Sequence, residues 1–318
     1  MSRINVNQEI KKIENMLKVL IQSEDKTLEE ASHHLLTSGG KRVRPLFVLL
    51  SSYIGQNKGN DEAYNVAVAL ELIHMATLVH DDVIDFSDKR RGNLTIEKKW
   101  DKSTAILTGN FLLSKAVTHL SQIKDYRIHQ ILSEAILEVC RGELFQFQDQ
   151  FRAHQSLTNY LRRINRKTAL LIQLATQVGT MTSNADDQTV HKMKTIGHNI
   201  GMSFQIVDDV LDFTSSEKKL GKPVGSDLRN GHMTLPVLLE MKKDRHFAEK
   251  IEQLNPNSSK ALFDECINQI RHSSVIQDSL DISKRYLDKA TELLETIEND
   301  DVKPLFKKLI KKLQTRMR

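Results

Sequence analysis

Residues 68–85 read VALELIHMATLVHDDVID, an apolar run that ends in a group of aspartates. The apolar residues of this run predict a helix that faces the core of the protein. Its carboxylates, at Asp81, Asp82 and Asp85, are unfavourable in such surroundings unless something positive balances them. The stretch therefore predicts a buried helix whose last turn binds a cation.

The same five-residue pattern, Asp-Asp-x-x-Asp, recurs in FQIVDDVLD at residues 204–212. Residues four apart share one face of a helix, so Asp81 and Asp85 can bind one cation together. The same holds for Asp208 and Asp212 in the second copy. Carboxylates without Cys or His partners select Mg²⁺ or Mn²⁺, and Mg²⁺ usually completes its shell with water and substrate phosphates. The two motifs, expected to face each other across a cavity, predict a magnesium site that binds a diphosphate.

The composition predicts helices throughout. The chain has 318 residues, of which 39% are hydrophobic, and it contains only five prolines and thirteen glycines. This scarcity favours long helices over a turn-rich β architecture, so we expect an all-α fold. No break between the helical segments resembles a linker. We therefore predict one domain over residues 1–318, a single large helical bundle around a central deep cavity.

Charge and hydropathy exclude several classes of protein. The net charge is +5, but the basic residues are spread along the chain and aromatic residues make up only 5%, so we expect no nucleic-acid partner. No stretch approaches about 18 uncharged apolar residues, and two cysteines are too few for a disulfide scaffold. We expect a cytoplasmic protein, and a transient membrane contact through the basic segment 303–318 stays open.

Basic residues bracket both acidic motifs, most densely in GGKRVRP at 39–45 and in RRG at 90–92. Helix starts and arginine side chains are common binding sites for phosphate groups. We infer that these charges meet a diphosphate held by the aspartates. The candidate cations are Lys41, Arg44, Arg90, Arg91, Lys167, Lys222 and Arg229.

Together these motifs resemble those of the all-trans polyprenyl diphosphate synthases, over essentially the whole chain. The large catalytic component (component II) of bacterial heptaprenyl and hexaprenyl diphosphate synthases is closest in appearance, because it also resembles the chain in VALELIHMA, EVCRGE and YLRRINRKTAL. The resemblance implies the all-α isoprenoid synthase fold. The segments that carry it are GGKRVRP at 39–45, ELIHMATLVHDDVID at 71–85, RRG at 90–92, RKT at 166–168, FQIVDDVLD at 204–212 and GKPVGSDLRNGHMTLP at 221–236.

The resemblance implies a trans-prenyltransferase that condenses isopentenyl diphosphate onto an allylic diphosphate. We expect farnesyl diphosphate as the allylic substrate and heptaprenyl diphosphate as the product, within a range from hexaprenyl to octaprenyl, for menaquinone side chains. The implied cofactors are three Mg²⁺ ions. The implied partner is a small second subunit in a heterodimer, with a homodimer as the alternative, and a membrane contact would serve product release.

The resemblance also implies a role for each matching residue. The metal ions would be held by Asp81, Asp82, Asp85 and Asp208, with Asp209 and Asp212 in support. The allylic diphosphate would bind Arg90, Lys167 and Lys222. The diphosphate of isopentenyl diphosphate would bind Lys41, Arg44, His74 and Arg91, while Thr168 and Gln205 would line the reacting end. The expected catalytic residues are Asp81, Asp82, Asp85, Asp208, Lys167 and Lys222.

Three other interpretations stay open. His80 and Asp81 resemble the His-Asp pair of an HD-type metal-dependent phosphohydrolase, but that interpretation leaves the second acidic motif unexplained. A class I terpene cyclase shares the first acidic motif and an all-α fold, but it does not account for a second diphosphate site. A non-catalytic regulatory subunit would be expected to lose acidic ligands, and this chain keeps all six.

Product length should depend on Ala76 and Thr77, which lie about one helical turn before Asp81 and point towards the expected cavity floor. Both side chains are small, which leaves room for a long product. Phenylalanine at either position should therefore shorten the product, as chromatographic sizing of the prenyl chain would show. An unchanged product distribution in both variants would contradict this assignment of the floor.

Overall fold

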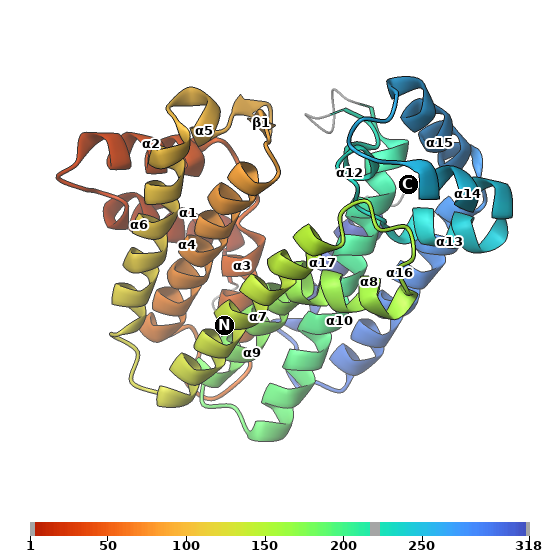
Figure 1. Cartoon of the computed structure of the whole chain (residues 1–318). Coiled ribbons are helices and arrows are strands. Elements are labelled where there is room, and N and C mark those ends of the chain that lie inside the picture. The colour runs from red at the N-terminus through yellow and green to blue at the C-terminus, as the bar shows by residue number, and fades with distance from the viewer. Residues whose placement is uncertain (1–3, 217–222, 316–318) are drawn as a thin grey trace. The chain divides into compact units, whose positions relative to one another are not determined.

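Helices make up most of the structure, a computed structural model that describes residues 4–216 and 223–315 (Figure 1). The predicted all-α fold is confirmed. Within the described residues the one departure is a short hairpin of β1 (Lys89–Arg90) and β2 (Asn93–Leu94). The chain divides into two compact units. Unit 1 comprises Met1–Ala135, Leu171–Gly197 and Leu293–Lys308, and unit 2 comprises Ile136–Leu170, His198–Glu292 and Leu309–Arg318.

Each unit is built from its own helices and from parts of longer ones. The helices of unit 1 are α1 (Val6–Leu20), α2 (Lys26–Thr37), α3 (Val43–Ser51), α4 (Asp61–Ile84), α5 (Ile96–Lys99) and α6 (Lys102–Leu120). Those of unit 2 are α8 (Leu157–Ile164), the π-helical η1 (Asn165–Ala169), α12 (Ser226–Arg229), α13 (Leu235–Lys243), α14 (Arg245–Gln253) and α15 (Lys260–His272). Divided between the units are α7 (Tyr126–Gln148), α9 (Leu170–Thr182), α10 (Asp187–Thr214), α16 (Val275–Glu295) and α17 (Lys303–Thr315).

Helix α4 carries the first acidic motif and is buried along most of its length. It begins at the N-cap Asn60, whose side chain accepts a hydrogen bond from the backbone N–H of Ala63. Figure 1 shows α6 beside α4, and the two helices pack closely along their lengths. A Cβ atom at Gly109 of α6 would lie 2.3 Å from His80 Nε2, so only glycine allows this approach. Tight packing therefore positions the acidic end of α4.

The short hairpin follows α4 in the chain, and Arg90 of β1 pairs with Asn93 of β2. Its two turn residues, Arg91 and Gly92, have φ angles of 52° and 84°. Two left-handed residues suit the twist of a tight hairpin, and glycine adopts that conformation freely. An arginine there is strained by roughly 1–2 kcal/mol. The sequence did not indicate this hairpin, because two-residue strands are too short to show an alternating pattern.

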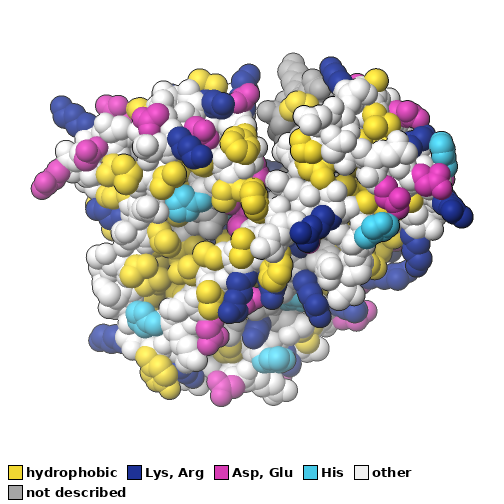
Figure 2. Space-filling model, viewed as in Figure 1, with side chains coloured by type: hydrophobic (Ala, Val, Ile, Leu, Met, Phe, Trp, Pro, Cys, Tyr) yellow, Lys and Arg dark blue, Asp and Glu magenta, His cyan; other side chains and the backbone are white. Residues whose placement is uncertain are grey.

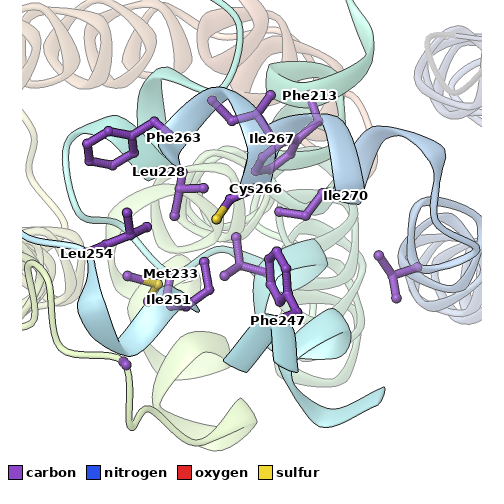
Figure 3. Packing of buried hydrophobic residues seen from close by; sticks show 13 residues of the cluster. Phe213, Leu228, Met233, Phe247, Ile251, Leu254, Phe263, Cys266, Ile267 and Ile270 are labelled. Atoms are coloured by element: carbon purple, nitrogen blue, oxygen red, sulfur yellow. The ribbon is translucent and has the colours of Figure 1, made fainter. Parts of the chain in front are cut away.

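In unit 2, the end of α10 is anchored in an apolar cluster (Figure 3). Phe213 directly follows the second acidic motif and is fully buried in this cluster. Burial of apolar surface contributes about 25 cal/mol per Å², so an aromatic ring held on all sides is a strong anchor. The cluster therefore fixes the position of the acidic motif in unit 2. Its other members are Ala153, Leu228, Met233, Val237, Phe247, Ile251, Leu254, Phe263, Cys266, Ile267, Ile270 and Val275.

Some large apolar side chains reach the surface, and Figure 2 shows such side chains on one face. In unit 1, α6 exposes Leu107 and Val117, and in unit 2 the second half of α7 exposes Leu137, Leu144 and Phe147. The three residues of α7 are spaced so that they share one side of the helix. None of the described helices has an apolar stretch long enough to cross a lipid bilayer. The stripe on α7 is thus an exposed apolar surface on a helix that does not span a membrane.

The two cysteines should react with a disulfide reagent at very different rates. Cys140 is exposed, whereas Cys266 is buried in the cluster of Figure 3, where burial raises the pKa of its thiol to about 11. Because the thiolate is the reactive form, we expect the Cys140 thiol to react quickly near about pH 8 and the Cys266 thiol to react only after unfolding in urea. Cys140→Ser should remove the fast phase, and a fast phase that survives this substitution would contradict the packing.

Candidate functional site

The first acidic motif closes helix α4. Asp81 and Asp82 lie in its last turn and are buried, while Asp85 is the C-cap residue and is half-buried. The backbone N–H of Asp85 donates to the carbonyl of Asp81 at 2.8 Å, so these two residues stand one turn apart as predicted. The C-terminal end of a helix also carries partial negative charge. Three carboxylates at this end therefore form a strong attractor for cations.

Arg90 of the hairpin forms a bidentate ion pair with Asp82. Its Nε donates to Asp82 Oδ1 at 2.8 Å and to Oδ2 at 2.9 Å, and its Nη2 lies 2.7 Å from Oδ1. Burial raises the pKa of Asp82, and the Arg90 charge opposes that rise. Such charge-assisted pairs are among the stronger hydrogen bonds in proteins. The hairpin thus places a cation directly on the acidic turn.

A second cationic group surrounds His74, two turns before the aspartates on α4. Burial is the main reason why the pKa of His74 lies well below 6.5, and the charges of Arg44 and Arg91 lower it further. The imidazole is therefore neutral near pH 7 and offers one N–H donor. Lys41 lies in the loop before α3 and is exposed, whereas Arg44 lies in the first turn of α3. Unit 1 thus brings Arg44 and Arg91 towards His74, three of the four residues that the sequence assigned to one diphosphate.

The second acidic motif is divided between one half-buried and two buried carboxylates. Asp208 is half-buried, whereas Asp209 and Asp212 are at most 2% exposed. Asp212 accepts hydrogen bonds from Ser226 Oγ at 3.0 Å and from the backbone N–H of Asp227 at 3.1 Å. These bonds hold the start of the short helix α12. Asp212 therefore contributes to the position of α12, and its supporting role in metal binding stays a prediction.

Asp209 belongs to a chain of buried hydrogen bonds in unit 2. Its Oδ2 accepts from the Tyr160 hydroxyl at 2.7 Å, and its Oδ1 accepts from Gln205 Nε2 at 2.8 Å. Gln205 Oε1 in turn accepts from Thr168 Oγ1 at 2.5 Å. Burial, and secondly the charge of Asp227, raises the pKa of Asp209 to about 7. This chain joins three predicted site residues, and Tyr160 is a member that the sequence interpretation missed.

Lys167 and Thr168 lie in the π-helical segment η1 between α8 and α9. Such segments are rare and often mark functional sites, because the extra residue per turn changes which side chains share a face. Lys167 Nζ donates to Glu143 Oε2 of α7 at 3.3 Å. A Cβ at Gly142, the residue before Glu143, would lie 2.8 Å from Cβ of Arg166, so α7 and η1 approach closely there. Neither η1 nor the role of Glu143 was visible in the sequence pattern.

The remaining predicted residues differ in their surroundings. Ala76 is buried, and Thr77 is half-buried with its hydroxyl donating to the carbonyl of His74 at 2.8 Å. Lys222 lies outside the described residues. Arg229 forms an ion pair with Asp264 of α15, so its charge is already balanced in unit 2. The contact of Arg229 with a diphosphate stays a prediction.

The acidic motifs supply an incomplete oxygen cage for a metal ion. Among residues 4–216 and 223–315, no three His, Cys, Asp or Glu side chains converge closely enough to hold a metal by themselves. Mg²⁺ rarely needs such a cage, because it binds through one or two carboxylates and completes its shell with water and phosphate. In unit 1 the predicted oxygen donors are Asp81, Asp82 and Asp85, of which Asp82 also pairs with Arg90. The donor set fits a magnesium ion that arrives with a diphosphate.

The histidines do not support a phosphohydrolase site of the His-Asp type. The ring of His80 packs against Gly109 of α6, where a single Cβ would already collide with it. Further upstream, His34 Nε2 contacts the carbonyl of Leu94 at 2.9 Å, and its ring packs against Trp100. These two histidines therefore serve packing and local hydrogen bonds in unit 1.

Comparison of the sequence with known proteins gives the following matches. The sequence model of the Polyprenyl synthetase family matches residues 25–270 of the chain. Heptaprenyl diphosphate synthase component 2 of Geobacillus stearothermophilus is 44% identical over 304 residues, which cover 96% of this chain and 94% of that protein. The similarity thus extends over nearly the full length of both sequences.

Solved structures agree with the sequence matches. Heptaprenyl diphosphate synthase from Staphylococcus aureus superposes with a TM-score of 0.98 at 61% identity, with 100% of each chain covered. A polyprenyl synthase from Caulobacter crescentus, solved in complex with calcium and isoprenyl diphosphate, gives a TM-score of 0.91 at 28% identity, covering 98% of this chain and 95% of that one. The all-helical fold is therefore shared with both proteins.

Neutralising Asp209 should change how stability depends on pH. Burial raises the pKa of this carboxyl from 3.8 to about 7, so between these values the folded protein keeps a proton that the unfolded chain has released. The free energy of unfolding therefore falls as pH rises through this window. Asp209→Asn cannot ionise, so its free energy of unfolding should not show this fall. For one proton, the slopes of the free energy of unfolding against pH can differ between the two proteins by at most about 1.4 kcal/mol per pH unit.

Urea unfolding in EDTA, at several values between about pH 4 and 7, would measure this difference. Asp288→Asn, at an exposed position of α16, is the matched control and should keep the pH profile of the unchanged protein. Parallel profiles for Asp209→Asn and the unchanged protein would show that the buried carboxyl is not perturbed as described.

Proposed function

The chain belongs to the polyprenyl synthetase family, and on that premise we propose that it condenses isopentenyl diphosphate onto an allylic diphosphate to make heptaprenyl diphosphate. The observation that carries the proposal is the arrangement on α4, where a cationic group around His74 lies two turns before an acidic turn capped by Arg90. One helix thus offers contacts for an anion and for a metal ion. Farnesyl diphosphate is the proposed allylic substrate.

Isopentenyl diphosphate is proposed to bind at Lys41, Arg44, His74 and Arg91. The two arginines lie close enough to His74 to lower its pKa, so the three side chains can act on one ligand. The guanidinium groups would neutralise the diphosphate, and the neutral imidazole would donate one hydrogen bond to it. Because Lys41 is exposed, it can reach a ligand that arrives from solvent.

The allylic diphosphate is proposed to meet the acidic motifs through Mg²⁺, with three ions as the proposed number. When bound, the metal ions would neutralise the departing diphosphate as Lewis acids. Asp81, Asp82, Asp85 and Asp208 would hold them, with Asp209 and Asp212 in support, and Asp82 also orients Arg90. Arg90, Lys167 and Lys222 would bind the diphosphate oxygens. The divalent metal is supported by the calcium in the related Caulobacter crescentus structure.

The hydrogen-bond chain of unit 2 is proposed to orient Gln205 and Thr168 at the reacting end. Tyr160 and Gln205 fix the carboxyl of Asp209, so the amide of Gln205 keeps one orientation. In the reaction the allylic carbon–oxygen bond breaks, a carbon–carbon bond forms, and one proton leaves. The released pyrophosphate is proposed to accept that proton, so the protein residues bind and orient rather than act as the base.

A long product agrees with the small side chains at Ala76 and Thr77, which are proposed to leave the cavity floor open. Heptaprenyl diphosphate is the favoured product because the two heptaprenyl synthases are similar to the chain over nearly its whole length. Menaquinone side chains are the proposed destination, and the cytoplasm is the proposed location.

A small second subunit is the proposed partner, with a homodimer as the alternative. The relative from Geobacillus stearothermophilus is named as a component, which supports a two-component enzyme. In addition, α7 exposes Leu137, Leu144 and Phe147 along one side, and exposed apolar surfaces of this kind often mark protein contacts. We also propose that residues 1–318 act as one domain, because the family match includes residues of both units.

The proposal predicts strict dependence on the acidic motifs. Purified protein, farnesyl diphosphate, isopentenyl diphosphate and Mg²⁺, with and without a candidate small component, should yield a heptaprenyl product measured by radiolabel incorporation and chromatography. Asp81→Asn and Asp208→Asn should each lower the rate roughly a hundredfold or more, because each removes charge that stabilises the leaving diphosphate. Asp288→Asn, on an exposed face, should keep the full rate.

Two results would count against the proposal. One is condensation at an unchanged rate in both Asn variants. The other is consumption of the allylic diphosphate at the same rate without isopentenyl diphosphate, which would indicate a terpene cyclase or a phosphohydrolase instead.

A further inference from the structure

Arg42 lies between Lys41 and Arg44 in the sequence but is buried, while Lys41 is exposed. No role was expected for it from the sequence pattern. Its ion-pair partner, Glu71 of α4, is buried as well, and both side chains are about 5% exposed. Arginine and glutamate are almost never buried unless they are paired. The burial of the Arg42–Glu71 ion pair therefore raises the question of which parts of the protein it holds in place.

The guanidinium of Arg42 joins three helices of unit 1 at the start of α3. Its Nη1 donates to Glu71 Oε1 of α4 at 3.1 Å, and its Nη2 donates to the carbonyl of Leu36 in α2 at 2.6 Å. Its Nε lies 3.5 Å from Glu14 Oε1 of α1, a more exposed carboxylate. The planar guanidinium of arginine, with several N–H donors, suits contacts to three helices better than the single ammonium of lysine.

The backbone around Arg42 is held in an unusual conformation. Arg42 itself is left-handed, with φ 46° and ψ 42°, and it follows Gly39 and Gly40, whose φ angles are 92° and 148°. A Cβ at Gly40 would lie 2.8 Å from Arg42 Nη1 and 2.7 Å from Arg91 Nη1, so the loop passes between two guanidinium groups. Left-handed non-glycine residues persist where surrounding contacts enforce them. The buried ion pair supplies those contacts.

This buried pair lies next to the cationic group around His74. Glu71 precedes His74 by three residues on α4 and so stands on the neighbouring turn. Arg42 adds to the positive charge that lowers the pKa of His74, after Arg44, Arg91 and Arg90. Arg42 is the N-cap residue of α3, so it lies between Lys41 of the loop and Arg44 in the first turn of that helix.

From this geometry we propose that Arg42 is a positioning residue, which through its buried pair with Glu71 holds Lys41 and Arg44 in place to bind isopentenyl diphosphate. The inference rests on the proposed function. Arg42 is not itself a ligand for the diphosphate, because Glu71 balances its charge and three protein oxygens surround it. Loss of the pair frees the loop and weakens the binding of one substrate, while the allylic substrate is bound by other residues.

The test is a comparison of steady-state kinetics in the full-length protein, with its second component present if activity requires one. Glu71→Gln keeps the size of the side chain and removes its charge. It should raise KM for isopentenyl diphosphate about tenfold or more, with KM for farnesyl diphosphate changed less than about twofold. Arg42→Met should have the same selective effect. Glu14→Gln, which alters the exposed partner of the same guanidinium, should leave both KM values unchanged.

Three results would each overturn the positioning role. They are equal rises in both KM values, unchanged KM values in a folded Glu71→Gln protein, and loss of the circular-dichroism melting transition in that variant. Turnover by the unchanged protein reports separately on the proposed function, since absence of any condensation there would refute the function and not the role of Arg42. Binding of isopentenyl diphosphate alone, measured by calorimetry, gives the same comparison without catalysis.

Discussion

Charge burial at the ends of two apolar helices is the constraint on which the rest of this structure depends. A buried carboxylate near the end of such a helix needs a partner, because an unpaired buried charge is highly unfavourable. Asp82 of α4 has the bidentate Arg90, and Asp209 of α10 has Tyr160 and Gln205. The surrounding elements are therefore arranged around the aspartates as much as around the apolar core.

Three irregular parts of the backbone lie where charges are balanced. Arg91 is left-handed in the turn of the hairpin that carries Arg90, and Arg42 is left-handed where it meets Glu71. In unit 2, the π-helical η1 brings Lys167 to Glu143. Each of these conformations is unfavourable in isolation, and each persists because ion pairs and hydrogen bonds enforce it. Strain and charge thus occur together at Arg91 and Lys167, which are proposed to bind diphosphate, and at Arg42, which is proposed to position such residues.

Much of the fold and part of the candidate site could be predicted from the sequence. Apolar runs and scarce glycine and proline predicted the helices, and the spacing of Asp81 and Asp85 predicted the acidic turn of α4. The hairpin and η1 could not be predicted, because two-residue strands and one inserted residue leave no periodic pattern. The pattern also could not show which protein groups the second motif contacts, whereas in the structure Asp209 accepts a hydrogen bond from Tyr160 and Asp212 accepts one from Ser226.

The sequence by itself determined that the chain is helical and that acidic and basic residues recur in a pattern suited to diphosphate and metal. These features are local, since periodicity and spacing along one helix need no knowledge of the rest of the chain. Only the tertiary structure decided which charges are engaged within the protein. The reason is that the deciding partners lie far apart in sequence, as with Tyr160 and Asp209, 49 positions apart, and with Arg42 and Glu71, 29 positions apart.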